Sequence, residues 1–320
     1  AITSPSMLEH KLRDISADNG ICISAEILYR RYNSDKYADK VHSMVDQFKD
    51  ARKIFLASNK NFYDICLYDF GADSSKIKSL LEERGFSVAL QSECSAELAA
   101  ASKLQVFSDS ENFKIDAFRI LNIPFISPIQ PYGFDATEKF LQSIIEALKS
   151  CESKYSDSPK KNNNSDNLSI LPSSEEIEVF SSLLEKLRNC LFGFIISEHD
   201  DVNLFEKGNK LPAAYAISFI RSCGLEFVFF IKNKGKAKVD MLSIEQLFPD
   251  SKKVLYNNLE ELKSLIAEEQ NLKFIYSDIR DDFRIFSLGK IPFSRNILEP
   301  GYLGAIETLR RFSELRELSL

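Results

Sequence analysis

Apolar residues recur along the chain with two spacings, which predict helices and buried strands in alternation. The segment 74–85, SSKIKSLLEERG, places Ile77, Leu80 and Leu81 on one helical face, begins with serine and ends with glycine. The segment 64–70, DICLYDF, is apolar over most of its length, as expected for a strand that is buried on both faces. Alternation of this kind predicts an α/β protein with a mainly parallel sheet.

The rest of the first half continues the alternation. We expect helices over 37–52 and 136–150, and strands over 53–58, 86–92 and 104–110. The proline-containing stretch between the last of these strands and the last helix is interpreted as a loop.

The second half begins with an expected helix over 173–189, whose Ser-Ser-Glu-Glu opening is typical of a capped N-terminus. A strand is expected over 191–197, and the segments 213–220 and 225–233 are interpreted as an antiparallel pair. Three leading strands followed by further alternation of helices and strands resemble a ribonuclease-H-like mixed sheet.

A polar stretch from Ser150 to about Ser174 divides the chain near its middle. It contains an asparagine run and two prolines, a composition typical of a linker or a long surface loop. We therefore expect a first domain over 1–149, a linker over 150–174 and a second domain over 175–320.

Composition narrows the functional classes. The 320 residues are 44% apolar and carry a net charge of −6, so the chain lacks the overall basic character of many nucleic-acid-binding proteins. The six cysteines are widely separated and form no CxxC pair, which argues against a zinc site and a disulfide framework. We expect an intracellular, cytoplasmic-type reducing compartment. No stretch reaches the roughly 20 apolar residues of a membrane helix, so no membrane partner is expected.

Two segments resemble the nuclease domains of family A DNA polymerases. The clearer one, 259–291, resembles the second motif of the 3′→5′ exonuclease domain, with Asp282 at the place of a metal-binding aspartate. Further on, Glu299 stands where that family has an aspartate. At the first motif, Ile195 and Ser197 replace the two carboxylates that the family uses to hold metal ions.

The first half resembles a reduced 5′-nuclease domain of the PIN/flap type. The segment 21–32, ICISAEILYRRY, resembles its opening strand, with Ile23 or Ser24 in place of the metal-binding aspartate. The segment 78–113 resembles the part that supplies further acidic ligands, and its candidates are Glu93, Glu97, Asp109 and Glu111. The resemblance implies a PIN-like parallel sheet followed by the ribonuclease-H-like one.

Each candidate also has a structural interpretation. Asp278, Asp281 and Asp282 follow an expected strand, where carboxylates commonly cap a helix. The acidic residues of the first half fit solvated loops, and His199 has no nucleophile or ligand partner in its sequence neighbourhood. The lysines of the run KNKGKAK could contact phosphates or belong to a hairpin turn; they are Lys232, Lys234, Lys236 and Lys238.

Three functional hypotheses follow. The first is a non-catalytic nuclease-like binding or scaffold module in DNA or RNA metabolism, as part of a DNA polymerase I-like protein, with no cofactor. The second is an active Mg²⁺-dependent exonuclease that uses Asp109, Glu111, Asp282 and Glu299, because two-metal cleavage needs carboxylates around ions about 4 Å apart. The third is a protein-interaction module unrelated to nucleic acids.

Overall fold

The structure is a computed structural model of the 320-residue chain. It describes residues 35–57, 63–95, 98–99, 101–108, 113–155, 170–196, 212–233, 248–249, 251–277 and 288–318. All structural statements below refer to these residues.

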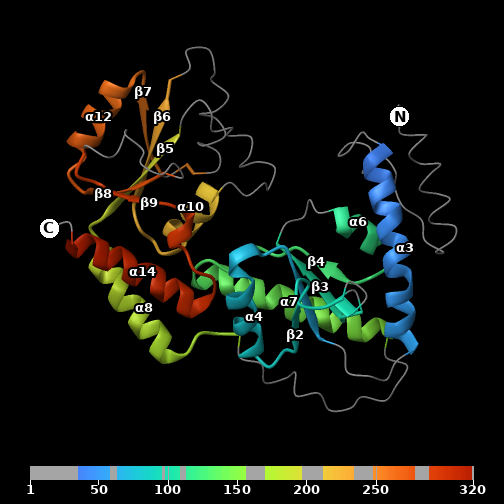
Figure 1. The fold of residues 1–320 in the computed structure, drawn as a ribbon. Helices are drawn as coiled ribbons and strands as arrows, with labels where there is room; N and C mark the ends of the chain where they lie inside the picture. Colours follow the sequence, from blue (N-terminus) through green and yellow to red (C-terminus); the bar gives the residue numbers. More distant parts are fainter. Residues whose placement is uncertain are drawn as a thin grey trace. The chain divides into compact units, whose positions relative to one another are not determined.

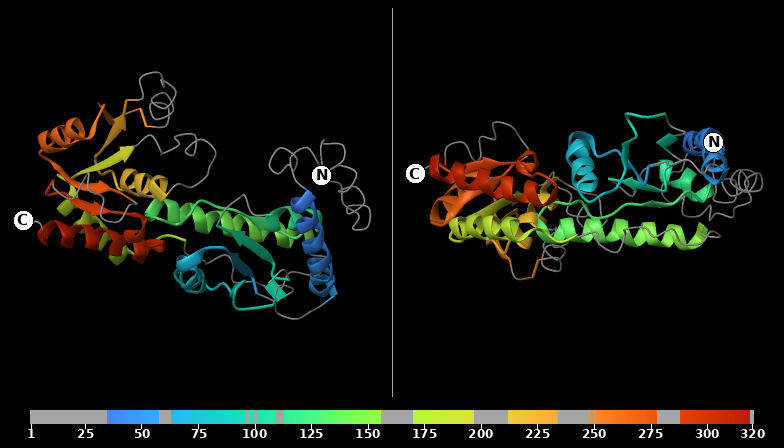
Figure 2. Two further views of the ribbon diagram at one scale, coloured as in Figure 1. Left: turned by 45° about the horizontal axis from the view of Figure 1, so that its top comes forward. Right: turned by 90° about the horizontal axis from the view of Figure 1, so that it is seen from below.

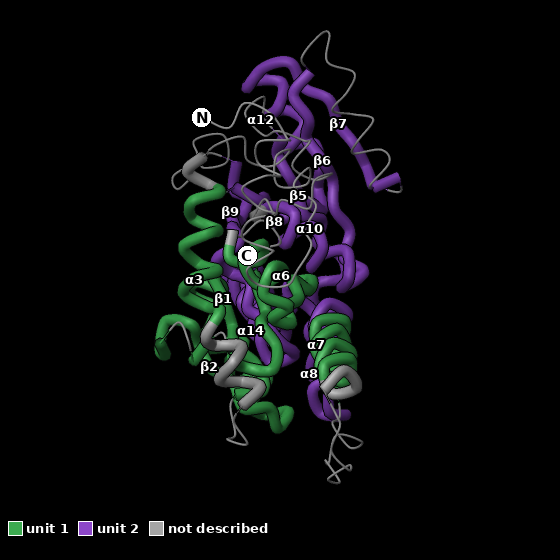
Figure 3. Tube along the Cα trace, turned by 90° about the vertical axis from the view of Figure 1, so that its right-hand side faces the viewer, with its two compact units in different colours: residues 1–129, 139–170 green, residues 130–138, 171–320 purple. Residues whose placement is uncertain are grey.

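The chain divides into two compact units that interleave along the sequence. The first comprises 1–129 and 139–170, and the second comprises 130–138 and 171–320, coloured green and purple in Figure 3. Helix α7 (Phe134–Tyr155) begins with residues of the second unit and continues with residues of the first. The helix therefore extends several residues into the stretch expected to be a linker.

The first unit is built on a four-stranded parallel sheet with the order β2-β1-β3-β4 (Figure 1). Its strands are β1 (Ile65–Tyr68), β2 (Val88–Leu90), β3 (Leu104–Phe107) and β4 (Phe125–Ile126). The helices of this unit, besides α7, are α3 (Asp35–Ala57), the short η1 (Gly71–Asp73), α4 (Ser74–Glu82) and α6 (Phe113–Ile120).

Helix α3 corrects one expectation for this unit, because it runs without interruption to Ala57. The strand expected over 53–58 is therefore wrong. A short apolar run has the same pattern in a buried strand and in the last turns of a helix, and here the preceding helix continues through it. Helices α3 and α6 pack on the face of the sheet that carries Cys66, Tyr68 and Phe107.

The second unit contains a five-stranded sheet with the order β7-β6-β5-β8-β9, and all neighbouring strands are parallel. Its strands are β5 (Leu191–Ile196), β6 (Phe227–Lys232), β7 (Lys252–Tyr256), β8 (Leu272–Tyr276) and β9 (Ile291–Phe293). Its helices are α8 (Ser174–Leu187), α10 (Pro212–Ser222), α12 (Leu259–Glu268), η3 (Arg295–Ile297) and α14 (Gly301–Leu318).

The parallel arrangement corrects the mixed sheet expected for this half. The segment 213–220, interpreted as a strand, forms most of α10, and β6 then pairs with β5 in parallel. A parallel neighbour requires a crossover connection, which α10 provides. The buried residues Ala216, Ile217, Phe219 and Ile220 recur with helical spacing, and Gly224 has a φ of +66° just beyond the helix, as a C-terminal cap requires.

Alternate strand residues of the second sheet face two different cores. Helices α8, α10 and α14 cover the face that carries Phe192, Phe194 and Phe274, whereas α12 covers the face of Ile195 and Phe230. Figure 2 shows α8 and α14 side by side.

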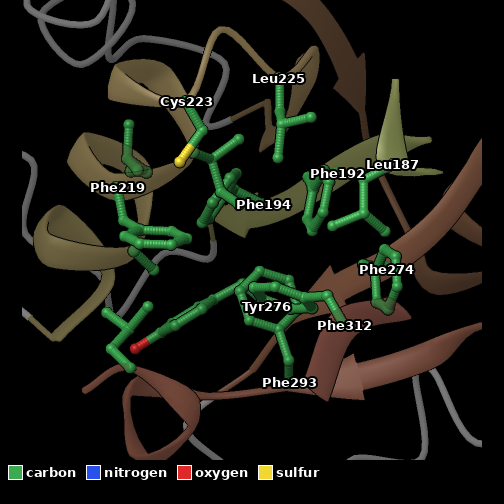
Figure 4. Packing of buried hydrophobic residues seen from close by; sticks show 14 of the residues in the cluster. Leu187, Phe192, Phe194, Phe219, Cys223, Leu225, Phe274, Tyr276, Phe293 and Phe312 are labelled. Atoms are coloured by element: carbon green, nitrogen blue, oxygen red, sulfur yellow. The ribbon is translucent and has the colours of Figure 1, made fainter. Parts of the chain in front are cut away.

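Aromatic rings fill much of the first of these cores (Figure 4). Phe192 stacks on Phe274 with centroids 4.7 Å apart, and the edge of Phe312 meets both rings. Edge-to-face and offset contacts of this kind add to the stabilisation that burial provides.

Candidate functional site

The carboxyl edge of the first sheet is the candidate site. In doubly wound sheets, ligands bind outside the carboxyl ends of the strands where the strand order reverses. Here β2 lies on one side of β1 and β3 on the other, so that point is the gap between the ends of β1 and β3. The first residues beyond the strands are Asp69 after β1, Gln91 after β2 and Ser108 after β3.

Asp69 has a left-handed backbone at this edge, with φ of +61°. Its carbonyl oxygen accepts a hydrogen bond of 2.6 Å from the Ser108 hydroxyl, and the Ser108 N–H donates to the Tyr68 carbonyl at 3.1 Å. These bonds join the ends of the two strands. A non-glycine residue in this conformation is uncommon and is often associated with a functional position.

Lys114, in the first turn of α6, brings a positive charge to this edge. Its Nζ donates to Gln91 Oε1 at 3.4 Å, lies 3.7 Å from Asp69 Oδ2 and stands 5.4 Å from the centre of the Tyr68 ring. Only 15% of its side chain is exposed. An ammonium group therefore neutralises the Asp69 carboxylate at the point where the strand order reverses.

The groups beneath Lys114 are poor nucleophiles. The Tyr68 hydroxyl is buried, and burial raises the pKa of Tyr68 far above its usual range. Burial also raises the pKa of the neighbouring Cys66 thiol. Since the thiolate is the reactive form of cysteine, Cys66 behaves as a small apolar side chain.

Glu93, one of the acidic candidates of the first half, lies in the loop after β2 and is already paired. Its Oε2 accepts a hydrogen bond of 3.0 Å from Lys78 Nζ. This bond raises the pKa of Lys78, so the ammonium form is favoured beside the carboxylate.

Glu299, the candidate of the second half, forms an ion pair with Arg311 of α14, and only 15% of its side chain is exposed. Its N–H donates to Thr308 Oγ1 at 3.0 Å, and the Thr308 hydroxyl also lies within hydrogen-bonding distance, 2.8 Å, of the Gly304 carbonyl. These contacts attach the segment before α14 to the side of the helix. The carboxylate compared with a metal ligand thus contributes to a local structural contact.

The other candidate residues lie at a strand end or outside the described residues. Lys232 is the last residue of β6, beside the central strand β5. Those outside the described residues are Asp109, Glu111, Asp282, Lys234, Lys236 and Lys238, together with Glu97, His199, Asp278, Asp281 and the first-half segment 21–32.

Two short sequence patterns occur once in each half of the chain. Asp-x-Phe-Arg-Ile occurs at 116–120 and at 281–285, and Ile-Pro-Phe follows at 123–125 and at 291–293. The second pattern leads into β4 in the first unit and forms β9 in the second. Each of these strands is the last at one side of its sheet: β4 pairs with β3, and β9 pairs with β8. The two patterns therefore occupy comparable places in the two sheets.

This repeat gives the acidic pair of the second half a counterpart. Asp281 matches Asp116, which is 2% exposed and accepts a hydrogen bond of 2.6 Å from Arg119. Asp282 matches Ala117, which is fully buried. At the place of Asp282, the first unit has no carboxylate. A search for internal repeats could have found this signal in the sequence.

Within the described ranges, no group of three histidine, cysteine, aspartate or glutamate side chains is arranged to hold a metal ion. In the same part of the chain, no helix has the length and apolar character needed to cross a membrane.

Comparison with known proteins does not assign the chain to a family. No protein-family model matches it, and no curated protein matches it. The candidate site must therefore be interpreted from its own chemistry.

Proposed function

We propose that this chain is a non-catalytic nuclease-like module that binds DNA or RNA through the backbone phosphates. The observation that carries the proposal is the state of the two described acidic candidates, one in each unit. Glu93 is paired with Lys78 and Glu299 with Arg311. A two-metal nuclease needs carboxylates that are free to coordinate the ions, and these two already neutralise basic side chains.

At the carboxyl edge of the first sheet, a basic side chain also occupies the place beside a carboxylate. Lys114 places a positive charge beside Asp69, where a metal-dependent enzyme would need a divalent ion. A fixed ammonium group compensates a carboxylate but cannot activate water as a bound metal ion does. This arrangement supports binding or scaffolding without cleavage.

The proposed contact with nucleic acid is the lysine run that begins at Lys232. This residue ends β6 next to the central strand of the second sheet, at the edge where doubly wound sheets bind ligands. Four lysines within seven residues supply local positive charge on a chain whose net charge is −6. Phosphate contacts require only such local charge, and the affinity they provide falls with salt.

The test combines a cleavage assay with a binding assay. The full chain is incubated with labelled single-stranded and duplex oligonucleotides in Mg²⁺ or Mn²⁺, and binding is followed by fluorescence anisotropy at several salt concentrations. We expect binding without cleavage. The logarithm of the affinity should fall with the logarithm of the salt concentration, with a slope of about 0.7 for each phosphate contact on a single strand.

Matched variants locate the contact. Lys232→Glu combined with Lys234→Glu should weaken binding strongly and reduce the salt slope, whereas the same change at the exposed Lys149 and Lys186 should have little effect. Metal-dependent cleavage that is lost in Asp282→Ala would identify the chain as an active nuclease instead. Absence of binding at low salt would leave the protein-interaction hypothesis.

A further inference from the structure

A cleft of about 680 Å³ lies at the edge of the second sheet where its strands begin, opposite the edge at which Lys232 ends β6. It is bordered by the C-terminal ends of α10 and α12 and by the residues at which β5, β6 and β7 begin. Its volume falls within the range of small-molecule sites, about 300–1,000 Å³. Helices and strands run in opposite directions in this unit, so the C-terminal ends of the helices lie beside the starts of the strands. The cleft is therefore separate from the carboxyl edges of both sheets.

The wall of the cleft is aromatic and held in place. Phe227 and Phe248 meet edge to face with centroids 6.1 Å apart, and both line the cleft. Lys253 Nζ donates to the Phe248 carbonyl at 2.8 Å and to the Ser251 carbonyl at 3.0 Å, which fixes the segment that carries the ring. The guanidinium of Arg221 lies 5.7 Å from the centre of the Phe248 ring. This ring therefore already contacts a cation through its face.

Of the three glutamates that line the cleft, one forms an ion pair with a described residue and two do not. Lys252 forms an ion pair with Glu269. Glu226 and Glu268 also line the cleft, and neither forms an ion pair with any residue that the structure describes. The aromatic wall is thus bordered by two carboxylates that no neighbouring described side chain neutralises.

The position of these carboxylates is electrostatically unfavourable. Glu268 is the last residue of α12, and Glu226 lies two residues beyond Gly224, which caps α10. The C-terminal end of a helix carries partial negative charge, so basic residues stabilise it and acidic residues do not. Departures from such local preferences tend to occur at functional sites. The last turn of α10 contains Arg221, whereas the last turn of α12 contains no basic residue, so a bound cation would relieve the repulsion chiefly at the end of α12.

We propose that this cleft binds an organic cation with an apolar stem, an amine or guanidine carried on an alkyl chain. The stem packs against Phe227 and Phe248, and the charged groups pair with Glu226 and Glu268. Two cations also line the cleft, but Lys252 is paired with Glu269 and Arg221 lies over the Phe248 ring. Phosphates and dicarboxylates are disfavoured because they would meet Glu226, Glu268 and the negative end of α12. The proposal does not depend on nucleic-acid binding at the other edge.

Agmatine, which carries a guanidinium and an ammonium group on a butyl chain, is the probe. Binding to the full chain is measured by isothermal titration calorimetry at low ionic strength. We expect agmatine to bind more tightly than the guanidinium ion alone, which has no stem, and glutarate not to bind. Glu226→Gln combined with Glu268→Gln should lose at least about tenfold in affinity, because each substitution removes a charge-assisted contact.

The control is Glu314→Gln combined with Glu175→Gln, which makes the same change in net charge at exposed positions on α14 and α8. It should bind agmatine as the unchanged protein does, and circular dichroism should give the same folded spectrum for all variants. Equal loss in the control and in the cleft variant would mean nonspecific attraction to an acidic chain and would overturn the proposal. So would an unchanged affinity in the cleft variant, or the absence of agmatine binding.

Discussion

The ring of Phe134 stacks on the ring of Phe180, with centroids 3.9 Å apart and planes inclined by 21°. Phe134 is the first residue of α7 and Phe180 lies in the middle of α8. The edge of Phe134 also meets Tyr302 at 5.1 Å, and the Gly301 N–H donates to the Pro131 carbonyl at 2.8 Å. The start of α7 is therefore built into the second unit, although most of that unit follows it by more than thirty residues.

Phe134→Ala should consequently destabilise the second unit. The side chain is only partly buried, so we expect a loss of about 2–3 kcal/mol in the free energy of unfolding, below the range for a fully buried phenylalanine. Denaturant unfolding measures the loss, and hydrogen exchange locates it. Protection should decrease in β5 and β8.

Ile129→Ala is the control, because this neighbouring side chain is half exposed, at 50%. It should change the stability by less than about 0.5 kcal/mol. If Phe134→Ala left exchange in β5 and β8 unchanged, the stacking on Phe180 would not contribute to the second unit.

Elements with local signals could be predicted from the sequence. The expected helix over 74–85 agrees with α4, and the apolar run at 64–70 contains β1. The opening of α8 was also predictable, because Ser173 and Glu176 form a reciprocal capping box. In each case the deciding residues lie within a few positions of one another.

Elements whose form depends on distant partners were not predicted. The apolar stretch at 213–220 fits a strand or a buried helix, and only the parallel pairing of β5 with β6 requires a helix there. Tyr132 lies in a stretch that reads as a loop, yet its hydroxyl accepts a hydrogen bond of 3.1 Å from Arg295. Long-range contacts of this kind leave no periodic pattern in the sequence.

The residues of the candidate site also divide into those with a local signal in the sequence and those that depend on distant partners. Glu93 and Glu299 could be selected as acidic residues near strand ends, but their partners Lys78 and Arg311 follow from packing. Lys114 was not selected, because nothing in its sequence neighbourhood distinguishes it from the other lysines of the chain. The order of the strands brings it to Asp69 and Gln91.

Gly304→Ala tests the close contact that positions Glu299. A Cβ atom at this position would lie 2.7 Å from the backbone carbon and oxygen of Glu299. Alanine in a helix normally gains about 1 kcal/mol over glycine, but the clash involves backbone atoms that cannot move independently. We expect a net loss of about 1–3 kcal/mol in thermal or denaturant unfolding. Leu303→Ala, at the exposed neighbouring position, should cost less than about 1 kcal/mol by comparison. A stabilised Gly304→Ala variant would show that the backbone around Glu299 moves to accommodate the added methyl group.

Thiol reactivity tests the burial of the cysteines. Burial raises the pKa of Cys223 to about 12, compared with about 8.5 for an exposed thiol, so the thiolate fraction at neutral pH is reduced by more than three orders of magnitude. Alkylation of the native protein followed by peptide mass spectrometry should label the partly exposed Cys151 well before Cys223. Rapid labelling of Cys223 would mean that the chain just after α10 opens frequently. In denaturant, the two should react at similar rates.

Asp64 should make the stability of the first unit depend on acid pH. It lies just before β1, where Oδ1 accepts a hydrogen bond of 2.6 Å from Lys103 Nζ and Oδ2 accepts bonds of 3.0 and 2.9 Å from the N–H and hydroxyl of Ser87. Burial acts to raise the pKa of Asp64, but these bonds outweigh it and the net pKa is lowered. The carboxylate thereby joins the beginnings of three neighbouring strands.

A folded-state pKa below the unfolded value means that the unfolded chain binds the proton more readily. The stabilisation is therefore complete above the unfolded pKa, about 3.9, and is lost as the pH falls through the lower folded value. Asp64→Ala should remove about 1–3 kcal/mol at neutral pH, because the Lys103 and Ser87 donors lose their acceptor. Its effect should shrink as the pH approaches 3, whereas Glu82→Ala, at an exposed position on α4, should cost little at any pH. Denaturant unfolding between pH 3 and 7, followed by hydrogen exchange in β1 and β3, measures both variants. A cost for Asp64→Ala that stays constant across this range would show that its ionised form does not stabilise the strand ends.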